Sequence, residues 1–142
     1  MSSRQRSIIA ALEAAVHIVL DRLAGELADL GLSQGEVNAL LQLDEGVAVT
    51  VARLQAATGQ RASTMTGVLD RLERRGLVER ALNPEDRRSF TVALTEPGVG
   101  VSRRIRQTFA DLDAMARQGI SRRSLDGYFE VLDRLAELTA RR

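Results

Sequence analysis

Two groups of residues contain arginine or short hydroxyl side chains, which are types that can contact phosphates and the edges of nucleotide bases. Arginine donates in pairs to phosphate or guanine, and serine and threonine hydroxyls reach either partner. The first cluster, on and just before a helix expected over residues 62–75, comprises Arg61, Ser63, Thr64, Thr66, Gly67 and Arg71. The second, in a polar turn expected over residues 83–88, comprises Arg87 and Arg88. The chain has arginine and no lysine, which mainly indicates a bias in the coding of the source, although arginine also suits these contacts better than lysine does.

The helix expected over residues 62–75 has an apolar and a polar face. The apolar face, at helical spacing, is formed by Met65, Val68, Leu69 and Leu72. On the polar face, Gly67 lets the backbone approach a duplex closely but offers no side chain to a base edge. Arg71 is the longest donor of this face. It lies more than two turns into the helix, which favours a phosphate over a guanine as its partner.

Composition excludes several kinds of chemistry. The chain has no cysteine, so it has no disulfide and no thiol chemistry. His17 is the single histidine, so one chain holds no zinc site built on two or more histidines. We find no glycine-rich phosphate loop and no nucleophile beside a base. We therefore expect no metal, no cofactor and no enzymatic activity.

The chain also lacks the features of a membrane or exported protein. No run approaches 18 consecutive apolar residues, and the N-terminal region has no apolar block of the signal-peptide kind. We therefore expect no membrane contact and a cytoplasmic location.

Short helices are expected to hold the first cluster in place. Ser33 and Glu36 have the spacing of a capping box, which opens a helix. Thr50 can cap a second short helix over residues 51–57, and the helix over residues 62–75 follows and ends at Gly76. Three short helices thus follow one another with tight connections.

A hairpin follows the three helices. Residues 77–80 and 90–94 read as strands, and the second alternates in the strand manner, with Phe90 expected in the core of the hairpin. A two-stranded hairpin is not stable alone, so it must pack against the helices before it. Three helices followed by a hairpin with a charged tip is the order of a winged helix-turn-helix.

Long apolar stripes lie on either side of this lobe. One runs from Ile9 to Leu30 on a single helix that Gly31 ends, and another runs from Leu125 to Leu138. Such stripes favour packing against a second chain, so we expect a homodimer. We predict a mainly α fold with a small β-hairpin wing: an N-terminal dimerisation helix (1–31), a winged helix-turn-helix lobe (32–96) and C-terminal dimerisation helices (97–142).

Charge is distributed unevenly along the chain. The formal net charge is only +1, so total charge does not mark a nucleic-acid-binding protein. Residues 51–95, however, carry eight arginines against five acids, whereas residues 1–50 carry three arginines against seven acids. The positive charge thus coincides with the helices and the hairpin.

Two stretches of the sequence carry a family resemblance. Residues 86–89 (DRRS), followed by residues 92–95 (VALT) and Gly98, resemble the wing signature of the MarR-type transcriptional regulators. Residues 69–80 (LDRLERRGLVER) resemble the end of that family's recognition helix and its first wing strand. The resemblance implies a dimeric repressor that binds double-stranded DNA at an inverted-repeat operator.

The resemblance also implies roles for particular residues. Arg88 corresponds to the wing arginine that enters the minor groove, and Thr66 to a position that the family often fills with threonine. Gly67 departs from the pattern, because the family often has a longer polar side chain there. Asp70 and Asp86 correspond to acids that orient arginines, with Arg80 as a candidate partner. An ordinary turn-forming role is an equal alternative for Asp86.

A small aromatic or phenolic effector is a further implication. It would bind in a cleft between the dimerisation helices and the DNA-binding lobe, and His17 beside the first apolar stripe is a candidate ligand residue. A half-buried packing role is the plainer reading of that histidine. The alternative function is a dimeric protein-interaction module of the same fold that has lost DNA binding, which the glycine at position 67 and the small net charge favour.

Overall fold

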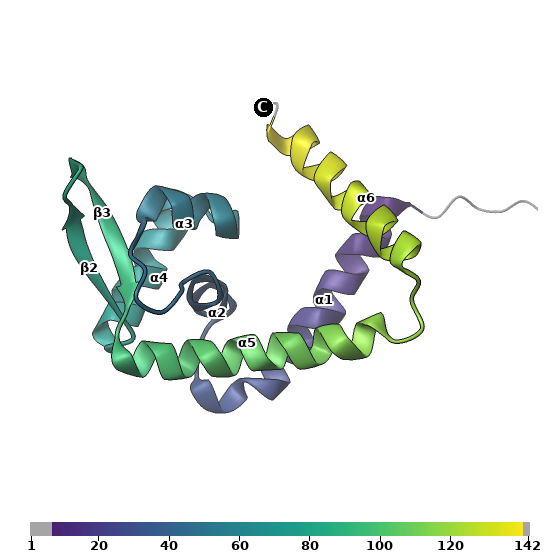
Figure 1. Ribbon diagram of the computed structural model, residues 1–142, viewed down its shortest axis with the longest axis horizontal. Coiled ribbons are helices and arrows are strands. Elements are labelled where there is room, and N and C mark those ends of the chain that lie inside the picture. Colours follow the sequence, from purple (N-terminus) through teal and green to yellow (C-terminus); the bar gives the residue numbers. More distant parts are fainter. Residues whose placement is uncertain (1–6, 141–142) are drawn as a thin grey trace, which may run out of the picture. The chain divides into compact units, whose positions relative to one another are not determined.

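The computed structural model describes residues 7–140, and side chains within residues 7–138. Residues 1–6 and 141–142, which the expected terminal regions include, lie outside the described residues. The fold is mainly helical with one small antiparallel sheet, as predicted (Figure 1). In chain order the elements are α1 (Ile8–Glu26), the 3₁₀ helix η1 (Ala28–Leu30), α2 (Gln34–Leu41), β1 (Val49–Thr50), α3 (Val51–Thr58), α4 (Ala62–Arg74), β2 (Val78–Asn83), β3 (Asp86–Leu94), α5 (Glu96–Arg117) and α6 (Arg122–Ala140).

Packing divides the chain into two compact units, residues 1–109 and 110–142. The first unit contains the three short helices, the sheet and the first part of α5. The division into two dimerisation regions and a DNA-binding lobe concerns function and stays a prediction.

The predicted caps open α2 and α3. The Ser33 hydroxyl accepts from the Glu36 amide at 3.3 Å, and the Glu36 carboxylate accepts from the Ser33 amide at 2.9 Å, which completes the capping box. The Thr50 hydroxyl accepts from the Arg53 amide at 3.2 Å. Each cap satisfies an amide that the first helical turn leaves without a partner.

The core forms where α2, α3, α4, the sheet and α5 meet. All four residues predicted on the apolar face of α4 are at most 1% exposed. They share the core with side chains from each of these elements, among them Leu40, Leu43, Leu54, Val92 and Ile105. The predicted orientation of α4 is confirmed.

The first helix is shorter than predicted. It ends at Glu26, and residues 28–30 wind more tightly as η1 before Gly31, which adopts a left-handed conformation with φ 60°. Arginines from distant elements bond carbonyls at this end and after η1, and Arg104 of α5 donates to the Glu26 carbonyl at 3.4 Å. Arg75 donates to the Leu30 and Gly31 carbonyls at 2.7 and 3.0 Å. Sequence periodicity could not reveal this end, because its hydrogen-bond partners lie far along the chain.

The sheet has the order β1-β3-β2, and its first strand was not predicted. Val49 and Thr50 pair with Val92 and Thr91 of β3. A two-residue strand is too short to produce an alternating pattern. This strand covers the base of the hairpin and joins it to the N-terminus of α3.

The hairpin differs from its prediction in two ways. Its strands extend to Asn83 and from Asp86, so the turn is shorter than the expected 83–88. Phe90 was expected in the core of the hairpin, but it is 48% exposed. Its partner on β2, Leu82, is exposed as well. The pairing with β1 ends at Thr91, so Phe90 lies beyond the strand that covers the base of the hairpin.

The first half of α5 is anchored to the lobe by polar contacts with α2 and the residues after it. The buried Ser102 hydroxyl donates to the Leu40 carbonyl at 3.0 Å, and Arg106 donates to the Leu43 carbonyl at 2.8 Å. In the second unit, Tyr128 and Phe129 of α6 are exposed and make an edge-to-face contact. Among the described helices, none combines the length and the hydropathy that crossing a membrane requires.

Gly98, in the first turn of α5, packs directly on the backbone at the start of the hairpin. A Cβ atom at this position would lie 1.8 Å from the Leu77 carbonyl oxygen. We predict that Gly98→Ala lowers the free energy of unfolding by about 3 kcal/mol, because the overlap is with backbone that cannot rotate away. Urea unfolding at equal protein concentration measures the change.

Gly100→Ala is the matched control for this prediction. It makes the same substitution two residues later in α5, where a Cβ atom meets nothing within 4 Å. Its stability should equal or exceed that of the wild type, because alanine favours helix more than glycine does. Equal stabilities of the two variants would contradict the close contact.

Candidate functional site

The first cluster of candidate residues lies together on the exposed side of α4. Arg61, Ser63, Thr64 and Thr66 are exposed, Gly67 is half-buried, and Arg71 follows one turn later. The Arg61 side chain makes no capping bond, although this residue is the N-cap of α4. The Thr66 hydroxyl donates to the Ala62 carbonyl at 3.1 Å, which leaves the lone pairs of its oxygen available. The face therefore offers short hydroxyls near the start of the helix and arginines at both ends.

Arg71 is held by a carboxylate that the sequence did not indicate as its partner. Its Nε donates to Oε1 of Glu36 at 2.7 Å. Glu36 is only 4% exposed, whereas the Arg71 side chain is 47% exposed. The capping-box residue of α2 thus also binds the arginine on the candidate face of α4.

An arginine clamp fixes the hairpin to α4. Arg80 of β2 donates to Asp70 at 2.6 Å and to Glu73 at 2.8 Å. The bond to Glu73, together with that to Asp70, raises the pKa of the Arg80 guanidinium above its ordinary value. The pairing of Asp70 with Arg80 agrees with the implied role. Glu73 was missed, although its position three residues after Asp70 places it on the same side of the helix.

Asp86 organises the hairpin turn. Its carboxylate accepts from the Arg88 amide at 3.0 Å, and its carbonyl accepts from the Ser89 hydroxyl at 3.1 Å. Among the ion pairs of the described residues, none joins Asp86 to an arginine. This geometry corresponds to the turn-forming alternative for Asp86.

Arg87 and Arg88 are exposed at the start of β3, where the tip of the hairpin projects beyond the helices (Figure 1). Successive strand residues point to opposite faces. One of the two arginines therefore lies on each face of the hairpin, and Arg88 shares its face with Phe90. The turn therefore places the positive charges of Arg87 and Arg88 at the exposed tip of the hairpin, away from the hydrophobic core.

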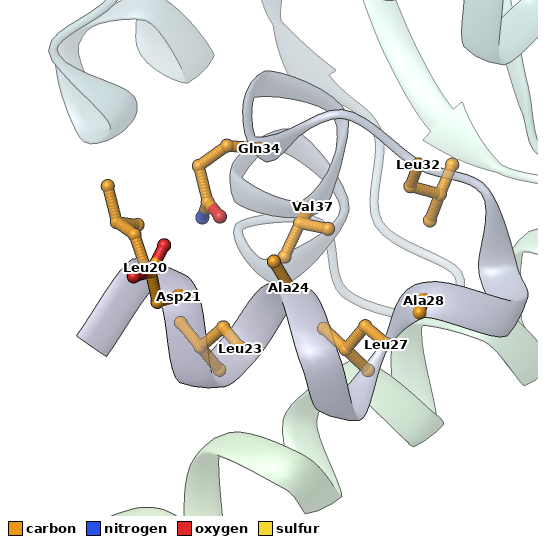
Figure 2. Close-up of a pocket in the computed structure, with 9 residues that line it drawn as sticks. All are labelled: Leu20, Asp21, Leu23, Ala24, Leu27, Ala28, Leu32, Gln34 and Val37. Atoms are coloured by element: carbon orange, nitrogen blue, oxygen red, sulfur yellow. The ribbon is translucent and has the colours of Figure 1, made fainter. Parts of the chain in front are cut away.

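A separate pocket of about 270 Å³ lies between α1 and the start of α2 (Figure 2). Its wall is mostly aliphatic, with one carboxylate and one amide, and is made of Leu20, Asp21, Leu23, Ala24, Leu27, Ala28, Leu32, Gln34 and Val37. The predicted ligand residue His17 is exposed one turn earlier on α1 and is not part of this wall.

Sequence comparison matches the part of the chain that builds the exposed face of α4, the arginine clamp and the tip of the hairpin. The model of the MarR family matches residues 30–89, from the end of η1 into the hairpin. The HTH-type transcriptional regulator YfiV of Bacillus subtilis (strain 168), described as uncharacterized, is 39% identical over 67 residues. That match covers 47% of this chain and 42% of the relative, so the chain spans less than half the length of the curated relative.

Solved structures match over nearly the whole chain. The transcriptional repressor CouR bound to a 23-mer DNA duplex is 25% identical, with a TM-score of 0.76 over 92% of both chains. NadR in complex with 4-hydroxyphenylacetate shares the fold at 21% identity, with a TM-score of 0.80 over 96% of both chains. These matches also agree with the expectation that the chain is not an enzyme. Residues 30–89 therefore resemble the MarR family in sequence, and the chain has the winged helix-turn-helix fold of solved transcriptional regulators of that family.

Proposed function

We propose that the chain acts in the cytoplasm as a homodimeric repressor that binds an inverted-repeat operator in double-stranded DNA. One observation carries this proposal: the clamp of Arg80 on Asp70 and Glu73 holds the hairpin against α4. The polar face of α4 and the arginines of the hairpin tip therefore move as one body. A helix in the major groove and a wing on the neighbouring backbone or minor groove need this fixed relation.

The polar face of α4 suits a major groove. Ser63, Thr64 and Thr66 are short enough to approach base edges, and Arg61 lies at the helix start, where recognition helices contact bases. Arg87 and Arg88 supply the wing with donors for phosphates or a narrow minor groove. CouR, which shares this fold, is described bound to a DNA duplex, and this supports the same use of the fold here.

We propose that the pocket between α1 and α2 receives a small phenolic effector. Its aliphatic wall suits an aromatic ring, and the Asp21 carboxylate can accept a hydrogen bond from a phenolic hydroxyl. The pocket also adjoins η1, whose last carbonyls accept from Arg75 at the end of α4. A ligand that shifts η1 would therefore act on the recognition helix. NadR is described in complex with 4-hydroxyphenylacetate, which supports this ligand class.

The terminal helices support a dimer. Exposed apolar side chains of α1 include Ile8, Ile9, Val16, Ile18 and Val19, and those of α6 include Tyr128, Phe129 and Leu138. Exposed apolar side chains in this number favour burial against a second copy. We predict that light scattering at micromolar concentration gives twice the 15.5 kDa chain mass. A folded, monodisperse monomer would contradict the dimer.

A two-fold dimer presents two α4 helices to one side of a duplex. We therefore predict that selection from random duplexes yields an inverted repeat with half-site centres roughly 10 base pairs apart. Binding of the selected and scrambled duplexes at two salt concentrations measures the preference. Equal binding to both, or none to either, would favour the protein-interaction module instead.

Arg88 tests the wing. We predict that Arg88→Ala weakens binding to all duplexes and lowers the slope of log affinity against log salt by about one, if the side chain neutralises one phosphate. The loss should be larger with A·T-rich flanks, where the minor groove is narrow. Arg22→Ala, which removes an exposed arginine of α1 paired with Glu26, is the control and should keep the wild-type slope. An unchanged affinity in a dimeric Arg88→Ala protein would remove the wing from the mechanism.

A further inference from the structure

Arg71 and Gly67 occupy the same spot on the surface of α4. A helical side chain covers the turn on the N-terminal side of its own Cα atom. A Cβ atom at Gly67 would accordingly lie 3.3 Å from Nη1 of Arg71, so close that Nη1 would have to shift by a few tenths of an ångström. The guanidinium thus lies one turn closer to the start of the helix than its sequence position indicates. The absent side chain at position 67 is what leaves room for it.

Glu36 sets the orientation of this guanidinium. It binds Nε, while its other oxygen is held by the amide of Ser33. A buried carboxylate is costly without a cationic partner, so this pairing is strongly maintained. Of the five N–H donors of the guanidinium, the four on Nη1 and Nη2 make no hydrogen bond among the described residues. Two donors on one planar edge are what guanine O6 and N7 require.

We propose that Arg71 reads a guanine in the major groove through its Nη groups, and that Glu36 is the positioning residue that aims it. This inference rests on the proposed DNA-binding function and names the residue that supplies its base specificity. Phosphate contacts tolerate a mobile cation, whereas a base contact needs a fixed orientation. The bond to Glu36 supplies this orientation and offsets part of the charge that would attract phosphate. The place over Gly67 brings the donors toward the end of the helix that contacts bases.

Replacing guanines by 7-deazaguanine tests the contact directly. This base lacks the N7 acceptor and keeps its Watson–Crick pairing. The operator is first obtained by selection, and each guanine of a half-site is then replaced in turn. For the wild type, one position per half-site should weaken binding by about fivefold, the lower end of what a bidentate pair of arginine and guanine contributes. The affinity ratio is the affinity for the duplex with guanine at that position divided by the affinity for the duplex with 7-deazaguanine there. In Arg71→Ala this ratio should fall to about one.

Glu36→Gln separates positioning from helix capping. Glutamine keeps an oxygen for the Ser33 amide, as capping boxes allow, but turns its NH₂ group toward Arg71 and loses the charge. The ratio should fall toward one in this variant too, while a purely structural role would leave the ratio at its wild-type value. Gly67→Ala is a second test that should not harm the fold, because alanine favours helix. Its Cβ atom would shift Nη1 by a few tenths of an ångström from the orientation that Glu36 sets, so its affinity ratio should also be below that of the wild type.

Two controls keep the comparison matched. Arg74→Ala removes another exposed arginine of α4, whose Nε donates to the Asp70 carbonyl, and should keep the fivefold ratio. Gly100→Ala repeats the glycine substitution in open space on α5 and should also keep it. Thermal melting of every variant shows which ones are folded.

The outcomes distinguish this inference from the function on which it rests. A selected operator without a guanine in its half-site, or a ratio of about one for the wild type at every guanine, overturns the inference alone. So does an Arg71→Ala protein that keeps the wild-type ratio, or one that loses affinity equally for all duplexes with a salt slope lowered by about one, as for a phosphate contact. If the wild type selects no sequence at all, the proposed function fails together with it.

Discussion

Burial of one face of α4 is the interaction on which the rest of the candidate site depends. Its four core side chains each contribute about 1.5–3 kcal/mol when fully buried, whereas an exposed ion pair contributes about 0–1 kcal/mol. The core therefore sets the rotation of this helix, and the ion pairs do not. Once Met65, Val68, Leu69 and Leu72 face inward, the helical period forces the hydroxyls and Gly67 toward solvent.

The ion pairs of α4 set the direction of the hairpin and the orientation of the Arg71 side chain. Arg80 ties β2 to the helix through Asp70 and Glu73, so the hairpin has one fixed direction relative to the exposed face. Glu36 ties Arg71 to α2 from a buried position, where a charge needs a partner. These ion pairs thus hold the side chains of Arg71 and Arg80 in defined orientations on the surface of α4.

The junction between α1 and α2 links two parts of the molecule. It carries the pocket on one side, through Leu27 and Ala28, and the carbonyls that Arg75 binds on the other. Arg104 of α5 binds Asp29 in the same junction, and its hydrogen bond lowers the pKa of that carboxyl. Elements that are distant in sequence therefore meet at a three-residue helix, which lies between the pocket and the C-terminal end of α4.

Features that depend on neighbours along the chain could be predicted from the amino-acid sequence. The capping box of α2, the Thr50 cap of α3, the buried face of α4 and the order of helices and hairpin follow from short spacings along the chain, and so does the family resemblance. Features that depend on distant partners needed the tertiary structure: the early end of α1, the two-residue β1, the exposure of Phe90 and the bond from Arg71 to Glu36, 35 residues away. The physical reason is that periodicity records which side of an element is apolar, whereas the partner of a polar group is set only when the chain folds.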